Sequence, residues 1–86
     1  MARELLSESR FGGTSTPADA YGAVANEAIG HIIERWNKGH GAPGDNTHIR
    51  NVHVHDEGGE HIGFRLYLVW NEPPRYGRPE IEVVTK

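Results

Sequence analysis

Polar side chains that can bind a ligand recur at alternate positions in two neighbouring segments rich in β-forming residues. They are Asn51, His53, His55, His61, Arg65 and Tyr67. Successive side chains of a strand point to opposite faces, so alternate residues share one face. A guanidinium, a phenol, an amide and imidazoles on a shared face can pair with an anion or an aromatic molecule. We therefore predict that these residues bind a small flat or phosphorylated ligand.

The three histidines of this set come together if the two segments pair as a hairpin. Cross-strand neighbours lie about 5 Å apart, and three imidazoles can hold zinc or copper. Asp56 and Glu57 could add a carboxylate. A ligand or subunit surface, or a solvated polar face, is the commoner fate of such histidines, so no metal is predicted. Because histidine titrates near pH 6.5, a pH-sensitive assembly is a related hypothesis.

Two hairpin registers compete. A five-residue loop pairs His55 with His61, whereas a two-residue Gly58-Gly59 turn pairs His55 with Ile62. The longer loop gathers the polar set on one face and places on the other Val52, Val54, Ile62, Phe64, Leu66, Leu68 and Trp70. A slip of one residue turns a whole strand over, so we expect the register that segregates the faces. In that register Arg50 points towards the apolar side, a conflict that the sequence leaves unresolved.

A long helix from Pro17 to Lys38 is the element that must cover the apolar face. Thr16 is a suitable N-cap, proline suits the first helical position, and Gly39 suits the C-cap. Gly22 and Gly30 lower the helix propensity and permit close approach of a neighbouring backbone. Apolar residues recur at helical spacing, namely Tyr21, Val24, Ala25, Ala28, Ile32 and Trp36.

The remaining segments complete the predicted architecture. Arg3–Phe11 is expected to form a strand, because a hairpin alone is marginally stable. The proline-rich segment Asn71–Pro79 must leave the ladder, and Glu80–Thr85 is predicted to be a short final strand. The fold class is therefore α+β, in the order β-α-β-β(-β). One long helix packs on one face of a small antiparallel sheet, in a single domain over residues 1–86.

The element order, with the segment Gly12-Gly13-Thr14-Ser15-Thr16-Pro17 running into an alanine-rich helix, resembles the dodecins. The resemblance covers about Glu4 to Trp70. It implies a helix that crosses the sheet, assembly into a hollow homo-oligomer and a bound flavin. The family's flavin-stacking tryptophan has no counterpart in Thr47-His48-Ile49-Arg50, and the chain contains no glutamine to supply the family's second flavin contact. The cofactor is therefore left unknown.

Composition narrows the function further. The net charge of −3 argues against a dedicated nucleic-acid binder. The absence of cysteine excludes thiol chemistry and suits a cytoplasmic setting. The longest apolar run, Leu66–Trp70, is too short to span a bilayer, and we expect no signal peptide. No motif of a known catalytic class is present, so we predict that the chain is not an enzyme.

The predicted function is thus a non-catalytic, homo-oligomeric binding protein for a small anionic or aromatic molecule. The alternative is a small protein-interaction module or inhibitor of phage or bacterial type. In that alternative the loop Arg75-Tyr76-Gly77-Arg78 and the acidic helix surface would contact a protein partner. Backbone N–H groups after Gly12–Thr16 are a further, weaker candidate for holding an anion.

Overall fold

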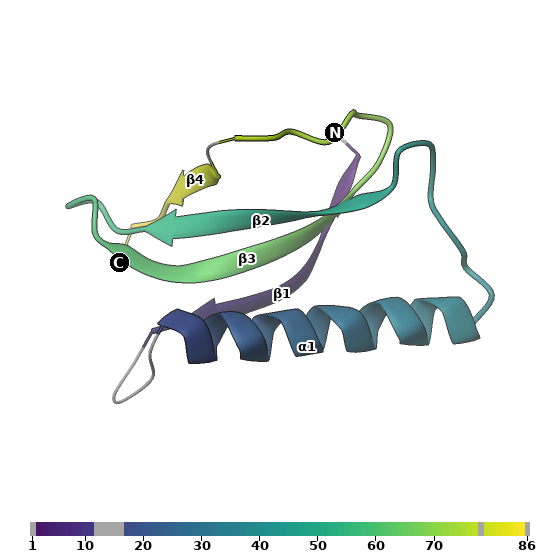
Figure 1. Ribbon diagram of the computed structural model, residues 1–86, viewed down its shortest axis with the longest axis horizontal. Coiled ribbons are helices and arrows are strands. Elements are labelled where there is room, and N and C mark those ends of the chain that lie inside the picture. The colour runs from purple at the N-terminus through teal and green to yellow at the C-terminus, as the bar shows by residue number, and fades with distance from the viewer. Residues whose placement is uncertain (1, 12–16, 78, 86) are drawn as a thin grey trace.

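The computed structural model describes residues 2–11, 17–77 and 79–85. It confirms an α+β fold with the elements in the predicted order (Figure 1). The elements are β1 (Arg3–Arg10), α1 (Pro17–Asn37), β2 (His48–His55), β3 (His61–Val69) and β4 (Glu80–Val83). The predicted cap Thr16 and the anion candidate Gly12–Thr16 lie outside the described residues.

The sheet is mixed, with the strand order β1-β3-β2-β4. β1 and β2 run antiparallel to β3, as predicted, whereas β4 runs parallel to β2. The prediction of a wholly antiparallel sheet is therefore wrong for β4. Figure 1 shows the reason: the segment after β3 passes the end of β2 and approaches its far edge, so β4 enters in the same direction as β2.

The hairpin register combines the two alternatives. His55 faces His61, as predicted, but the register shifts at once, and Val54 faces Gly63. From Val54 back to His48, which faces Val69, each residue of β2 pairs one residue further along β3 than the segregated register requires. The prediction that one face is apolar and the other polar is wrong, because the strand slip turns the two valines of β2 away from the helix.

Both faces of the sheet consequently carry a hydrophobic core. The cluster under α1 consists of Leu6, Ala20, Val24, Ala28, Phe64, Leu66 and Leu68. A second cluster on the opposite face consists of Val52, Tyr67 and Val69. Ser7 and Ser9 secure the helix to β1, since their hydroxyls donate to the carbonyls of Val24 at 2.7 Å and Ala20 at 3.1 Å.

Candidate functional site

The six predicted ligand-binding residues are divided between the two faces of the sheet. Asn51 and His53 pair with residues of the core under α1, so their side chains lie on the helix side. Arg65 and Tyr67 lie on the face opposite α1, where Tyr67 belongs to the second core cluster. The prediction of one shared face is therefore wrong, and binding of a ligand by these residues stays a prediction.

Arg65 is held in a network of ion pairs on the face opposite α1. Its guanidinium donates to Glu8 and, at 2.7 Å, to Glu82. The hydroxyl of Tyr67 also donates to Glu82, at 2.9 Å. The guanidinium of Arg3 lies 4.1 Å from the centre of the Tyr67 ring and 3.1 Å from a Glu82 oxygen. Arg65 therefore already has two carboxylate partners and is a poor receptor for a further anion.

The ionisation of these groups follows from the same contacts. Burial raises the pKa of the Glu82 carboxyl, but hydrogen bonds from Arg65 and Tyr67 and the charges of Arg65 and Arg3 outweigh it, so the net shift is downward. The hydrogen bonds to Glu8 and Glu82 raise the pKa of Arg65. Burial, followed by the hydrogen bond to Glu82, raises the pKa of Tyr67. The network therefore stays charged on Arg65 and Glu82 at neutral pH, while Tyr67 keeps its proton.

The three imidazoles lie together on the helix side, near the hairpin end. The rings of His53 and His61 stack with centroids 4.5 Å apart, and the ring of His55 lies 5.4 Å from His61. Phe64 packs edge-on against His61. The Nε2 of His61 lies 2.8 Å from the carbonyl oxygen of Gly63, so it carries the proton and donates it. Within residues 2–11, 17–77 and 79–85, no cluster of side chains is arranged to hold a metal ion.

Burial lowers the pKa of His53, and positive charge on His61 and His55 lowers it further. The fold therefore favours a neutral imidazole at His53.

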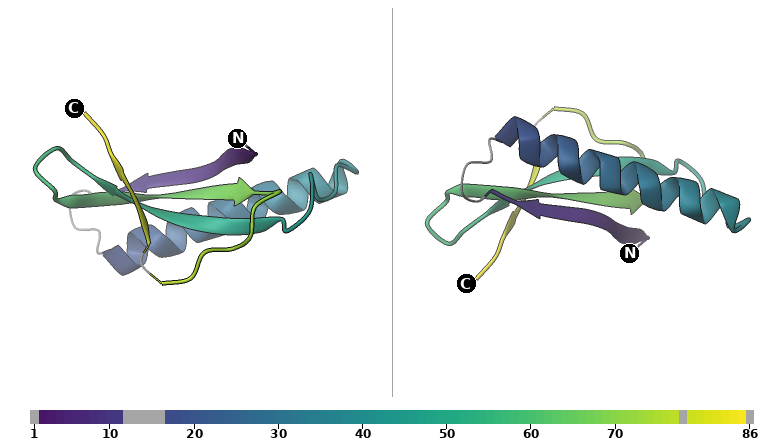
Figure 2. Two further views of the ribbon diagram at one scale, coloured as in Figure 1. Left: turned by 90° about the horizontal axis from the view of Figure 1, so that it is seen from above. Right: turned by 90° about the horizontal axis from the view of Figure 1, so that it is seen from below.

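Half of the helix-side face is left uncovered. α1 packs on β1 and β3, and β2 and β4 lie beyond it (Figure 2). The flank of α1 beside β1 is polar, with Arg35 bonded to Glu4 at 3.0 Å. The other flank is apolar, and Tyr21 reaches the core there with its ring 5.3 Å from Phe64. Trp36, predicted to pack on the sheet, is 72% exposed.

Exposed apolar side chains on this flank and on the uncovered strands face the same side of the sheet, and we call them together the apolar patch. It consists of Tyr21, Ile29, Ile33 and Trp36 on α1, Ile49 on β2, and Ile81 and Val83 on β4. Ile81 and Val83 pair with His53 and His55, so the imidazoles lie within the patch. An apolar surface that runs across a helix flank and two strands is typical of a contact with another molecule.

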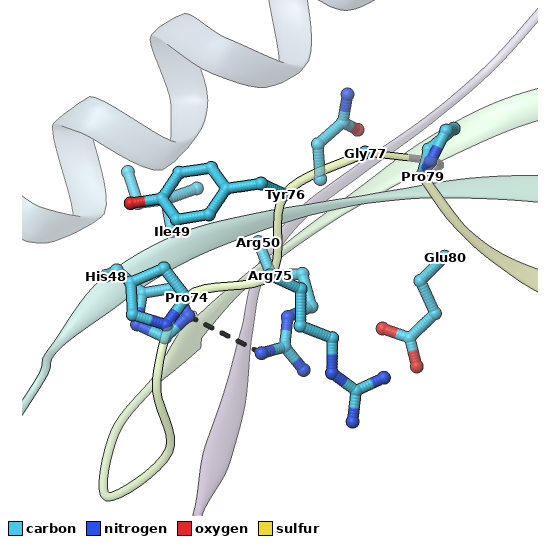
Figure 3. Close-up of a pocket in the computed structure, with 10 residues that line it drawn as sticks. His48, Ile49, Arg50, Pro74, Arg75, Tyr76, Gly77, Pro79 and Glu80 are labelled. Atoms are coloured by element: carbon cyan, nitrogen blue, oxygen red, sulfur yellow. Dashed lines mark hydrogen bonds between the residues drawn. The ribbon is translucent and has the colours of Figure 1, made fainter.

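A cleft of about 720 Å³ lies along the outer edge of β2, between residues 48–51 on one side and residues 74–77, 79 and 80 on the other. We call it the edge cleft (Figure 3). Arg50, 10% exposed at its side chain, pairs with Glu72 at 2.9 Å, and Arg75 pairs with the same carboxylate at 3.3 Å. The hydrogen bond from Arg50 lowers the pKa of Glu72. Tyr76 is 93% exposed above Ile49.

The sequence drew attention to two parts of this cleft but did not predict that they lie side by side. The loop around Arg75 and Tyr76 stood out as a basic aromatic patch, and Arg50 stood out as a charge on the wrong face. The crossover that brings them together follows from the parallel placement of β4, for which the sequence carried no signal.

Comparison with known proteins does not assign the chain to a family. No protein-family model matches the chain, and no curated protein or solved structure is similar to it. Among the described residues, no helix combines the length and apolar character needed to cross a bilayer.

Proposed function

We propose that this chain is a non-catalytic binding protein that works as a homo-oligomer, and that the apolar patch is the contact between copies. The observation that carries the proposal is the uncovered half of the sheet beside an apolar helix flank. The resemblance to the dodecins, a family of homo-oligomers, favours the same arrangement. The closed ion-pair network around Arg65 argues against that face as the ligand site.

Sheet geometry indicates what fills the uncovered half. Strands lie about 4.8 Å apart, and a helix with its side chains is about 10 Å wide. One helix therefore covers about two strands, and α1 covers β1 and β3. β2 and β4 leave room for about one more helix, and α1 is the only helix among the described residues. A second copy of α1 has the width and the apolar flank that this space requires.

The size of the patch supports the same conclusion. At roughly 150–250 Å² for each large side chain, the exposed fractions of the seven residues correspond to roughly 600–900 Å². A stable interface buries about 800 Å² on each partner. The largest apolar patch of a typical monomer is only about 300–600 Å². Two copies joined through this surface therefore reach the area of an ordinary dimer.

The test compares two glutamate substitutions in α1. Ile33→Glu places a charge inside the patch, and Ala23→Glu places the same charge at an exposed site near Glu27. Native mass spectrometry and sedimentation equilibrium across the micromolar range should show an oligomer for the unsubstituted chain. Ile33→Glu should weaken it by about 100-fold or more, because a buried unpaired carboxylate costs several kcal/mol.

Ala23→Glu should leave the association unchanged. A wild-type chain that stays monomeric throughout this range would refute the proposal. Equal weakening by the two substitutions would show that the contact lies elsewhere on the molecule.

A further inference from the structure

We propose that mild acid weakens the self-association of this chain, because His53 lies inside the apolar patch and a proton on its ring would be buried when a second copy covers it. This inference rests on the proposed contact and names its regulation. Ile81 of β4 pairs with His53, and Val83 pairs with His55. Both β4 side chains are exposed and belong to the patch. A helix that covers β2 and β4 therefore covers these imidazoles as well.

The contacts of His53 within the chain are with other rings. Its imidazole stacks on that of His61 with the two planes 6° apart, and it meets the ring of Phe64 edge-on at 5.3 Å. α1 reaches the same cluster through Tyr21, whose ring also lies edge-on to Phe64. Burial lowers the pKa of His53, and positive charge on His61 and His55 lowers it further. These neighbours offset none of the cost of a charge on the ring.

The carboxylates of the neighbouring strands lie on the other face of the sheet. On β4, Glu80 and Glu82 alternate with the two patch residues and pair with Arg3, at 3.8 and 3.1 Å. On β1, Glu8 stands opposite a residue of that same face and pairs with Arg10 at 3.6 Å. The sheet itself therefore separates these charges from the imidazole of His53.

The hairpin loop next to His55 holds three further carboxylates. Asp56 is directed into the turn, where its Oδ1 accepts from the N–H groups of Gly58 and Glu60, both at 2.9 Å. Glu57 and Glu60 are exposed, and exposed charges act only weakly through water and salt. The loop therefore supplies no buried partner for a proton on His53.

The helix of a second copy would not supply one either. Between Tyr21 and Trp36 its apolar flank carries residues three or four positions apart, namely Gly22, Ala25, Ile29 and Ile33. Asp19 precedes this flank in the first turn, and the two glutamates of α1 are paired within their own helix, Glu27 with His31 at 3.6 Å and Glu34 with Lys38 at 2.8 Å. Covering His53 thus removes water from the ring without adding an anion, which disfavours its charged form.

The sign of the effect follows from this difference. A ring that is harder to protonate in the assembled state takes up its proton more readily in the free chain, so a fall in pH favours the free chain. Histidine titrates near pH 6.5 when it is unperturbed. Between about pH 7.5 and about pH 5.5 the requirement for one neutral ring then costs about 10-fold for each copy, or about 100-fold for a pair. Because the pKa of His53 is already lowered in the single chain, we expect a loss of about 10- to 100-fold.

The test measures the dissociation constant by sedimentation equilibrium at about pH 7.5 and about pH 5.5, with circular dichroism to confirm that the chain is folded at both. The unsubstituted chain should associate about 10-fold or more weakly at the lower pH. His53→Gln keeps a polar side chain that takes up no proton, so it should reduce the change to about 3-fold or less. His31→Gln, on the flank of α1 beside β1, should keep the full change.

Ring titrations by NMR give a second readout that leaves His53 in place. The titration midpoint of His53 should be lower in the unsubstituted oligomer than in the Ile33→Glu chain, and that of His31 should be the same in both. A chain that is monomeric at neutral pH would refute the proposed contact and this inference with it. An oligomer that associates as tightly or more tightly in mild acid, or a His53 midpoint that association leaves unchanged, would overturn the pH dependence alone.

Discussion

Replacing two helix glycines one at a time separates the stability of the chain from its self-association. Gly22 and Gly30 both lie in α1, and nothing lies within 4 Å of the position that a Cβ would take at either. Alanine is favoured over glycine in a helix interior by about 0.8–1 kcal/mol. For a domain of this size 1 kcal/mol shifts the thermal midpoint by about 4–8 °C. Either alanine should therefore raise the midpoint of the monomeric chain by about 3–8 °C.

The two positions differ in the flank of α1 on which they lie. Gly22 precedes Ile29 by about two turns and shares the flank of the apolar patch. Gly30 lies next to Glu27 and Glu34 on the surface. A methyl group at Gly22 would meet the partner helix, and overpacking costs about 1–3 kcal/mol. Gly22→Ala should thus weaken association by about 5- to 150-fold, and Gly30→Ala should leave it unchanged.

The assay needs two backgrounds. Thermal unfolding is measured in the Ile33→Glu chain, where both glycine variants should be more stable by similar amounts. Sedimentation equilibrium is measured in the unsubstituted chain, where only Gly22→Ala should change the dissociation constant. Equal association constants for both variants would place Gly22 outside the contact. A thermal midpoint that neither substitution raises would contradict the open space described around both glycines.

Three further substitutions test the sheet and its titrating groups. Gly63→Ala should lower the free energy of unfolding in urea by about 1–3 kcal/mol, because the new Cβ would lie 2.2 Å from the carbonyl oxygen of Ser9; unchanged stability would refute that close approach. Glu82→Gln should cost about 1.5–3 kcal/mol through its lost charged hydrogen bonds, while the exposed control Glu57→Gln should cost little. The pKa of His53 is lowered in the folded chain, so the unfolded chain binds the proton more readily and stability should fall as pH drops below about 6.5. His53→Gln should flatten that pH profile, and an unaltered profile would assign the dependence to other groups.

The order of elements was predictable because local signals and tertiary packing agree. The N-cap expected at Thr16, the proline after it and the spacing of Val24 and Ala28 predict a helix, and the structure confirms a helix over Pro17–Asn37. The strand assignment of Arg3–Arg10 rested on the need for a third strand, and β1 indeed pairs with β3. Where one physical requirement dominates a segment, its secondary structure can be inferred from a single sequence.

The register was not predictable, because two requirements conflict within the hairpin. A segregated register would place Val52 and Val54 on the same face as the apolar residues Phe64, Leu66 and Leu68, but it turns Arg50 inwards. The register shift after His55 lets Arg50 reach Glu72. Tyr67 and Val69 then form a second core with Val52. In the sequence, the conflict at Arg50 was the one indication against the segregated register. It did not indicate that the apolar residues of the sheet would be divided between two faces.

The prediction that the site residues share one face was wrong for the same reason. Residues such as His53 and Arg65 were grouped by a register that does not hold, so they occupy different faces. Proximity of the histidines was predictable, because His55 and His61 flank the loop. The edge cleft depends on a crossover over residues 70–79, whose path is set by long-range pairing.

The network on the face opposite α1 ties residues that are far apart in the chain, since Arg3 and Glu82 are bonded across 79 positions. Until β4 arrives, Arg3 and Arg65 lack their Glu82 partner, and the outer edge of β2 is free along its full length. A ribosome-bound chain therefore cannot complete its sheet before Glu80–Val83 has been synthesised. A product that stops before Glu80 would leave Arg3 without its partners Glu80 and Glu82 beside an open strand, a surface by which a cell's quality-control proteases could distinguish it from the full-length product.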